Sequence, residues 1–192
     1  MDTSALTREQ LEERLVALHR ASLELVRDIS RESLMERIAT VACQQVSARY
    51  AAVGILDENG KLEKFIPVGM SPVEIGRMAH PPVGKGLIGA LMDAEHSIRL
   101  GSIAADPRSS GFPPHHPRMD TFLGAPIRHG DQQLGQIYLT NKIGGGEFSA
   151  DDQAVIEMLA SYAAVALSNA RLVDRLTRGE VGVTPAHEVA GH

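Results

Sequence analysis

Two adjacent histidines, His115 and His116, are the residues best placed to bind a ligand. They lie between Pro113, Pro114 and Pro117. Proline fixes the backbone angle φ, removes an N–H donor and disfavours helix in the residue before it, so we expect a stiff, extended loop. A neutral imidazole on such a loop can bind a metal ion. The alternative is the commoner one for a loop histidine, a side chain exposed to solvent.

The single cysteine, Cys43, limits the other chemistry that the chain could perform. One thiol excludes intramolecular disulfides, cysteine-based zinc sites, iron–sulfur clusters and covalently attached c-type haem. It also excludes a methionine sulfoxide reductase, which needs a nucleophilic and a resolving cysteine. Cys43 falls in a helical pattern, where we expect it to be a small buried hydrophobe. A zinc site built from His115, His116 and His129 stays open but lacks the usual ligand spacing.

A glycine-rich segment, Gly84 to Gly89, matches the pattern G-x-G-x-x-G of dinucleotide-binding proteins. That pattern binds a dinucleotide only where it follows a buried strand in a βαβ unit, and here it follows His80-Pro81-Pro82-Val83. We therefore interpret it as a turn into a short helix at 87–93. The first N–H groups of such a helix could meet an anion such as a carboxylate.

Length and composition predict one globular domain with helical extensions. The chain has 192 residues, with 19 Lys and Arg against 24 Asp and Glu. This mild acidic excess provides no electrostatic footprint for nucleic acid. The apolar runs are too short for a membrane span, and the first residues lack a signal-peptide pattern. We expect a cytoplasmic protein that binds neither nucleic acid nor membranes.

Two β-hairpins must position these candidate residues. The first contains Asn59-Gly60, which favours a type I′ turn, and the second turns at 129–131 and carries Tyr138 in its last strand. Gly54 interrupts the first strand and indicates a bulge or a close approach to the backbone. The strands are expected at 50–56, 61–68, 97–103, 122–128 and 134–140.

Helices are expected on either side of the strands. Ser149 and Asp152 form a capping pattern at the start of the last helix. The first and last helices carry narrow apolar seams at spacings of three and four, which predict pairing with another chain. We therefore divide the chain into a dimerisation helix at 1–29, a sensor domain at 30–178 and a disordered tail at 179–192. Within the sensor domain, helices are expected at 34–47, 71–79, 87–93 and 151–178.

This order of elements predicts an α+β fold with an antiparallel sheet flanked by helices. It resembles a GAF domain, with the terminal helices forming a dimerisation bundle. Within that family, the sequence is similar to the haem-binding GAF domains of mycobacterial dormancy oxygen and redox sensor kinases. The matching stretches are 48–50, 84–91, 98–100, 110–117, 122–128 and 138–140.

The resemblance implies a site for one b-type haem per chain. In those sensors the proximal ligand of the iron matches His116, and a tyrosine on the distal side matches Tyr138. The resemblance also implies a sensor of a diatomic gas (O2, NO or CO) or of redox state, and not an enzyme. The remaining residues that it implies for the pocket are Gly54, Gly86, Ile88, Met119, Phe122 and Leu123.

The sequence departs from the sensor kinases because no kinase segments follow Leu176. We therefore expect that the chain either signals, as a homodimer, to a histidine kinase or another protein in trans, or is a piece of a longer sensor. The main alternative is a GAF module that binds a cyclic nucleotide or another small molecule without haem. Asn141-Lys142, Phe148 and Asp152 match the spacing of the cyclic-nucleotide signature, with Gln153 in place of its glutamate. These residues are equally explained as a strand end that meets a capped helix.

Overall fold

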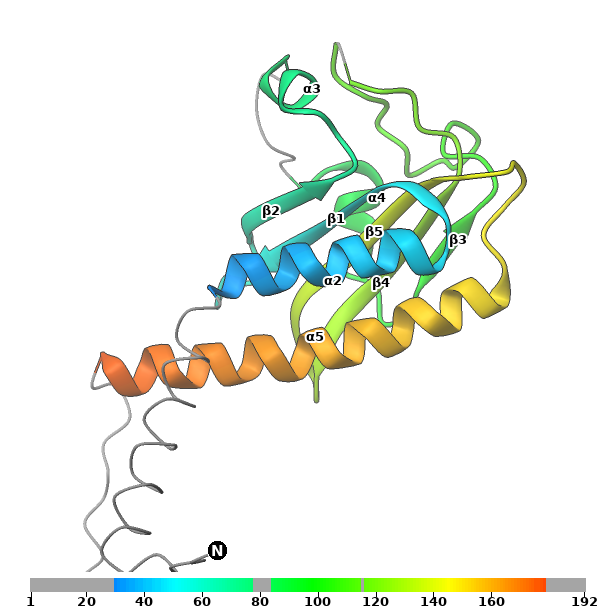
Figure 1. The fold of residues 1–192 in the computed structure, drawn as a ribbon. Coiled ribbons are helices and arrows are strands. Elements are labelled where there is room, and N and C mark those ends of the chain that lie inside the picture. Colours follow the sequence, from blue (N-terminus) through cyan, green and yellow to red (C-terminus); the bar gives the residue numbers. More distant parts are fainter. Residues whose placement is uncertain (1–29, 78–83, 115, 179–192) are drawn as a thin grey trace, which may run out of the picture.

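A five-stranded antiparallel sheet forms the centre of the fold, and the predicted α+β class is confirmed (Figure 1). The computed structural model describes residues 30–77, 84–114 and 116–178. The predicted dimerisation helix and the tail lie outside these residues, so the dimerisation bundle stays a prediction. The strand order is β2-β1-β5-β4-β3. The strands are β1 (Ala48–Leu56), β2 (Leu62–Val68), β3 (Ile98–Leu100), β4 (Phe122–His129) and β5 (Gln132–Lys142).

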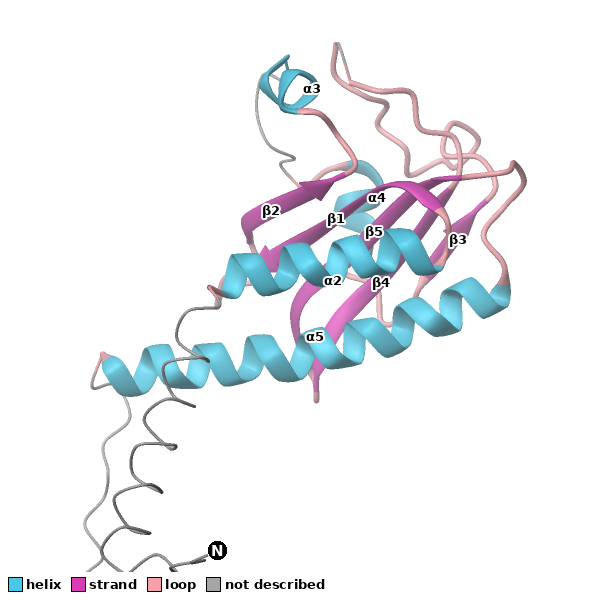
Figure 2. Cartoon of the chain, in the orientation of Figure 1, coloured by secondary structure: helices cyan, strands magenta, loops and turns pink. Residues whose placement is uncertain are grey.

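The helices cover the two faces of the sheet unequally (Figure 2). The long helices α2 (Arg31–Gln45) and α5 (Ala150–Thr177) lie side by side on one face. The shorter α4 (Gly86–Met92) packs on the other face, and α3 (Pro72–Arg77) follows β2. Among the described residues, no helix is both long enough and apolar enough to cross a membrane.

Each face of the sheet has its own hydrophobic core, because successive side chains of a strand point to opposite faces. Ile137 and Leu139 of β5 join α2 and α5 in the larger core. Tyr138, between them, joins Leu87 and Leu91 of α4 in the smaller core. Burying a side chain of this size stabilises the fold by about 1.5–3 kcal/mol. The sheet is therefore held from both sides, but the smaller core leaves room for a cavity.

The turn of the first hairpin differs from the predicted type I′. A type I′ turn needs positive φ at both central residues. Only Gly60 has it, with φ of 74°, whereas Asn59 does not. The Gly60 N–H donates to the Asp57 carbonyl (3.2 Å), and the Asp57 carboxylate accepts from the N–H groups of Asn59 and Lys61. Asp57 thus favours a type I turn followed by a left-handed glycine, which a prediction based on Asn-Gly alone missed.

The second hairpin agrees with its prediction, but the strand at its edge is shorter than expected. His129 pairs directly with Gln132, so Gly130 and Asp131 form a two-residue turn. The strand predicted at 97–103 is reduced to β3 because its last pair is Leu100 with Phe122, the first residue of β4. Residues after Leu100 therefore have no residue of β4 opposite them with which to pair.

Gly135 is a position where the central strands approach too closely for any side chain. A Cβ atom at this position would lie 2.3 Å from the Gly54 carbonyl oxygen. We predict that Gly135→Ala lowers the free energy of unfolding by about 2 kcal/mol or more, because the β1 backbone must move. Urea unfolding monitored by circular dichroism measures the change. Gly76→Ala is the control, since a Cβ there meets nothing within 4 Å; equal stability of the two variants would contradict the prediction.

Candidate functional site

A cavity of about 430 Å³ lies on the α4 side of the sheet. This volume is within the range of small-molecule pockets. Strands β1, β2, β4 and β5 provide its floor, and α4 and the loop around residues 109–119 provide its walls. Most of the lining is apolar or aromatic. The lining residues used below are Phe65, Lys85, Ile88, Phe112, His116, Met119, Phe122, Tyr138 and Thr140.

His116 lines this cavity with one ring nitrogen already engaged. Its Nδ1 lies 2.8 Å from the Pro117 carbonyl oxygen. A carbonyl oxygen can only accept, so Nδ1 carries the proton and Nε2 of the neutral ring keeps its lone pair. The backbone N–H of His116 donates to Pro113 (3.2 Å), and the ring stacks on Phe112 at 4.7 Å between centroids. The loop therefore holds an imidazole in the tautomer that binds metals through Nε2.

Tyr138 lines the same cavity, but its hydroxyl group already has a partner. The hydroxyl donates to Oε1 of Gln136 at 2.7 Å. Burial raises the pKa of Tyr138, so the phenol is neutral. The ring packs between Phe65 and Phe122, at centroid distances of 6.1 and 6.3 Å. A bound molecule can receive this hydrogen only if Tyr138 changes partners.

The other residues implied for the pocket do not all reach it. Ile88, Met119 and Phe122 line the cavity. Gly86 lies beside it, and a Cβ there would be 2.5 Å from Ser110 Oγ, so the glycine lets the loop approach α4. His115 lies outside the described residues.

Like Gly86, the expected pocket residues Gly54 and Leu123 are absent from the cavity lining. Leu123 is fully buried in the larger core, because it follows Phe122 on β4 and points to the opposite face. Gly54 lies on the Tyr138 side of the sheet. A Cβ atom there would be 2.9 Å from side-chain atoms of both Leu62 and Gln136. Gly54 therefore borders Gln136 and not the open cavity.

Three polar residues near the cavity were not among the predicted ones. Thr140 and Lys85 line it, and Gln136 is fully buried beside Tyr138. In the part of the chain that the structure describes, neither the buried Thr140 Oγ1 nor Gln136 Nε2 has a hydrogen-bond partner. The sequence carried a signal for Gln136 and Thr140. Side chains alternate between the two faces of a strand, so residues 136 and 140 share the face on which Tyr138 lies.

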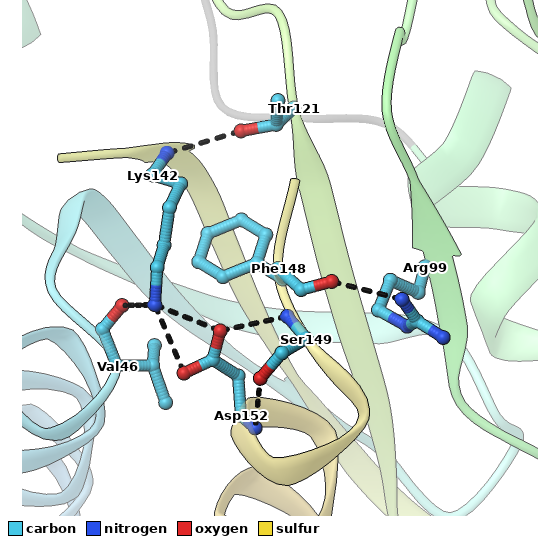
Figure 3. Close-up of polar contacts among 7 residues, drawn as sticks. All are labelled: Val46, Arg99, Thr121, Lys142, Phe148, Ser149 and Asp152. Carbon is cyan, nitrogen blue, oxygen red and sulfur yellow. Dashed lines mark hydrogen bonds and ion pairs between the residues drawn. The ribbon is translucent and has the colours of Figure 1, made fainter. Parts of the chain in front are cut away.

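The end of β5 is tied to the start of α5 by an ion pair (Figure 3). Lys142 Nζ lies 2.8 and 3.0 Å from the two carboxylate oxygens of Asp152 and donates to the Val46 carbonyl at 3.0 Å. Asp152 also accepts from the Ser149 N–H, while Ser149 Oγ accepts from the Asp152 N–H, which confirms the predicted cap. Partial burial would raise the pKa of Asp152, but hydrogen bonds from Lys142 and Ser149 outweigh it and lower the pKa.

The rest of the signature shared with cyclic-nucleotide-binding domains also makes contacts within the fold. Phe148 is fully buried in the larger core, and its carbonyl accepts from Arg99 at 2.9 Å (Figure 3). Asn141 adopts positive φ and bonds through its side chain to the backbone of Asp120 and Arg118. None of Asn141, Lys142, Phe148 and Asp152 lines the cavity. These contacts agree with the interpretation of a strand end meeting a capped helix.

A zinc site is not assembled in the part of the chain that the structure describes. It contains no group of three or more His, Cys, Asp or Glu side chains that could hold a metal ion. His116 precedes β4 and His129 ends it. The eight-residue strand that lies between them in the chain has ends roughly 23 Å apart. Cys43 lies on α2, and its thiol donates to the Ala48 carbonyl at 2.9 Å.

The fold and the match to known families agree. A family model described as GAF domain matches residues 28–168. The chain belongs to the GAF domain family. A GAF domain is a regulatory domain that binds small ligands, which agrees with an apolar cavity on one face of the sheet.

The chain has a relative that is a much longer protein. It is 28% identical over 171 residues to the dual 3′,5′-cyclic-AMP and -GMP phosphodiesterase 11A of Takifugu rubripes, covering 78% of the chain but 18% of that protein. The chain thus spans about a fifth of the length of this relative.

Solved structures show the same fold at low identity. The GAF domain of a phosphoenolpyruvate-protein phosphotransferase from Coxiella burnetii has a TM-score of 0.64 at 21% identity, covering 86% of this chain and 96% of that one. The second GAF domain of DevS from Mycobacterium smegmatis has a TM-score of 0.56 at 20% identity, covering 77% and 99%. These likenesses support the fold alone, so closeness to the haem-binding branch stays a prediction.

The ion pair between Lys142 and Asp152 predicts a pH-dependent part of the stability. We expect Lys142→Met to lower the free energy of unfolding by about 2 kcal/mol, between the values for exposed and buried pairs. Because folding lowers the pKa of Asp152 below its ordinary 3.8, its contribution is present above that pH and is lost as the pH falls through the folded-state value. The loss caused by Asp152→Asn should therefore shrink below about pH 4.

Urea unfolding between pH 3 and 7 measures both effects. Lys64→Met is the matched control, because Lys64 pairs with Glu32 at 2.6 Å on the surface, with half of its side chain exposed. This exposed pair should contribute less than about 1 kcal/mol. If Lys142→Met were as stable as Lys64→Met, or more stable, the result would contradict a structural role for the signature residues.

Proposed function

We propose that this GAF domain is a sensor that binds one b-type haem in the cavity, with His116 as the axial ligand of the iron. The observation that carries the proposal is the position of His116 on the cavity wall with Nδ1 bonded to Pro117. This bond leaves Nε2 as the only nitrogen with a free lone pair. Among the described residues, His116 is the one histidine that lines the cavity.

The other lining residues fit the chemistry of haem. A porphyrin is flat and apolar, and Ile88, Met119 and Phe122 present apolar or aromatic surface. Its two carboxylates need cations or N–H donors, and Lys85 lies on the wall at the start of α4. When bound, haem would supply an iron that binds a diatomic gas or changes redox state. The chain's own residues would hold the iron through His116 and keep water from its surroundings.

A second candidate is a sensor of a cyclic nucleotide or another small molecule in the same cavity. The relative whose name includes cyclic AMP and cyclic GMP favours it. The signature residues do not add to this support, because their contacts are made inside the fold. A cyclic nucleotide would instead depend on the cavity itself, where Lys85 could meet its phosphate.

We propose that the output of the domain passes through α5 in a homodimer. Ile156, Ala160, Ala163, Ala164 and Leu167 bury one face of α5 against the domain. The opposite face exposes apolar side chains at spacings of three and four, as helices that pair along a seam do. Its exposed members are Met158, Tyr162, Val165, Leu172, Val173 and Leu176, with Asn169 among them. The signal would then pass to a histidine kinase or another signalling protein in trans.

The haem proposal predicts that one histidine controls the visible spectrum. Titration of the purified chain with haem should give a Soret band at one equivalent. His116→Ala should lose this band or weaken haem affinity by more than about 10-fold, since even indirect partners of a metal ligand contribute that much. His129→Ala is the control at the far end of β4.

Two outcomes would contradict this proposal. The first is an unchanged spectrum and affinity for His116→Ala while His115→Ala loses both, which would assign the ligand to the neighbouring histidine. The second is no haem uptake together with saturable binding of cyclic AMP or cyclic GMP by calorimetry, which would favour the second candidate.

The dimer proposal predicts twice the chain mass in light scattering at micromolar concentration. Val165→Lys, in the exposed seam of α5, should shift the mass towards the monomer because two lysines would face each other. Glu157→Lys also places a lysine on the same helix, but outside the seam, and it should leave the dimer intact although it changes the net charge by two units. A monomeric wild-type chain would exclude the homodimer, and equal effects of both variants would exclude this seam.

A further inference from the structure

Gln136 is a fully buried polar residue next to the cavity whose side chain is only half satisfied. Its Oε1 accepts the hydrogen bond from the Tyr138 hydroxyl at 2.7 Å. Its Nε2 is buried and has no hydrogen-bond partner among the described residues. Buried amides in native folds almost always have partners, so an unpartnered one beside a ligand cavity calls for an explanation.

The neighbouring strands make room for this amide without supplying a partner for it. Gln136 pairs with Gly54 of β1 on one side and with Pro126 of β4 on the other. A Cβ atom at position 54 would lie 2.9 Å from Gln136 Oε1, closer than real Cβ atoms come. The glycine therefore admits the amide. Neither neighbour has a side chain that could accept from Nε2.

The oxygen and the NH2 group of a primary amide have nearly the same shape. Rotating the amide by half a turn about the bond that attaches it therefore exchanges the acceptor and the donor. In the observed orientation, Tyr138 gives its single hydrogen to Gln136 and has none for the cavity. In the turned orientation, Nε2 would donate to the Tyr138 oxygen. One N–H of the amide would then have a partner, Oε1 would lose its donor, and the hydroxyl hydrogen would be free for an acceptor in the cavity.

We propose that Gln136 is a positioning residue that decides where Tyr138 donates its hydrogen bond. Without a ligand, Gln136 accepts this bond and holds the hydroxyl away from the cavity. An acceptor bound in the cavity favours the turned amide, because the hydroxyl group then accepts from Nε2 and also donates to the acceptor, which makes two hydrogen bonds in place of one. This inference rests on the proposed function, since the acceptor is a gas or another ligand in the same cavity.

The first test needs no haem. The chain has three tyrosines and no tryptophan, so labelling tyrosine Cζ with carbon-13 gives three resonances, and Tyr138→Phe assigns one of them. The Cζ shift reports the hydrogen bond of the hydroxyl group. Gln136→Met should shift the Tyr138 resonance in the haem-free protein. The control is Gln133, which is on the same strand as Gln136 and donates to the Leu91 carbonyl. Gln133→Met removes this bond and should leave the Tyr138 resonance unshifted.

The second test measures dioxygen dissociation from the haem-loaded protein in a double-mutant cycle. Gln136→Met should change the rate by roughly 5-fold, the factor that corresponds to about 1 kcal/mol. In the Tyr138→Phe background the same substitution should have no effect, because the hydroxyl on which Gln136 acts is gone. A purely structural role would give equal effects in both backgrounds and would overturn the proposal.

The first test is independent of the haem assignment, whereas the second requires it. An unmoved Tyr138 resonance in a folded Gln136→Met protein overturns the positioning role whether or not haem binds. If the protein takes up no haem, the proposed function fails, while the resonance still decides the role of Gln136. Gln136→Leu is a second variant in case Gln136→Met does not fold. Both tests use a variant whose circular dichroism spectrum matches that of the wild-type protein.

Discussion

The alternation of side chains along β5 is the constraint on which the rest of this domain depends. β5 is the central strand and pairs with β1 on one side and β4 on the other. Ile137 and Leu139 attach α2 and α5 to one face, while Tyr138 faces the cavity. A slip of one residue would exchange these faces, placing Tyr138 under the helices and leucine in the cavity. The register of β5 therefore defines the core and the site together.

The far end of the same strand carries the ion pair that holds α5. Lys142 bonds Asp152 and the end of α2 through the Val46 carbonyl, so one side chain joins three elements. Lys142 lies four positions after Tyr138 along β5. A change in the cavity that moved β5 would thus reach the start of α5 through this contact. The residues that match the cyclic-nucleotide signature make contacts that stabilise the fold. The residues that line the cavity therefore determine which ligand binds.

The cavity combines apolar walls with polar groups that are only partly satisfied. Unpartnered buried donors are costly in a native fold, by about 1–3 kcal/mol each. Gln136 and Thr140 both carry a buried polar atom without a partner, on either side of Tyr138. His116 has one nitrogen engaged and the other free. Among the described residues, two of the four buried side-chain polar atoms without a partner lie here, where a ligand would supply the missing partners, and the other two are Ser97 Oγ and Arg171 Nη1.

The sequence by itself determined the local elements, because their signals are local. The capped helix after Ser149, the two hairpins and the stiff loop before His116 follow from capping residues, β-prone runs and prolines whose effects span a few residues. The type I′ assignment failed because the Asp57 side chain competes for the turn. The resemblance to GAF domains then implied that His116 and Tyr138 share a pocket, and both line the cavity.

Only the tertiary structure decided which residues surround that pair. Leu123 points into the larger core and Gly54 lies against Gln136, because strand register and the packing of α2 and α5 assign the faces. Gln136 was missed because a polar residue in a strand ordinarily indicates an exposed face. Its burial depends on Gly54 and Pro126, which lie 82 and 10 positions away in sequence and become its neighbours only when the sheet forms. Contacts between distant segments carry no local signal, so the site's second layer of residues could not be predicted from the sequence.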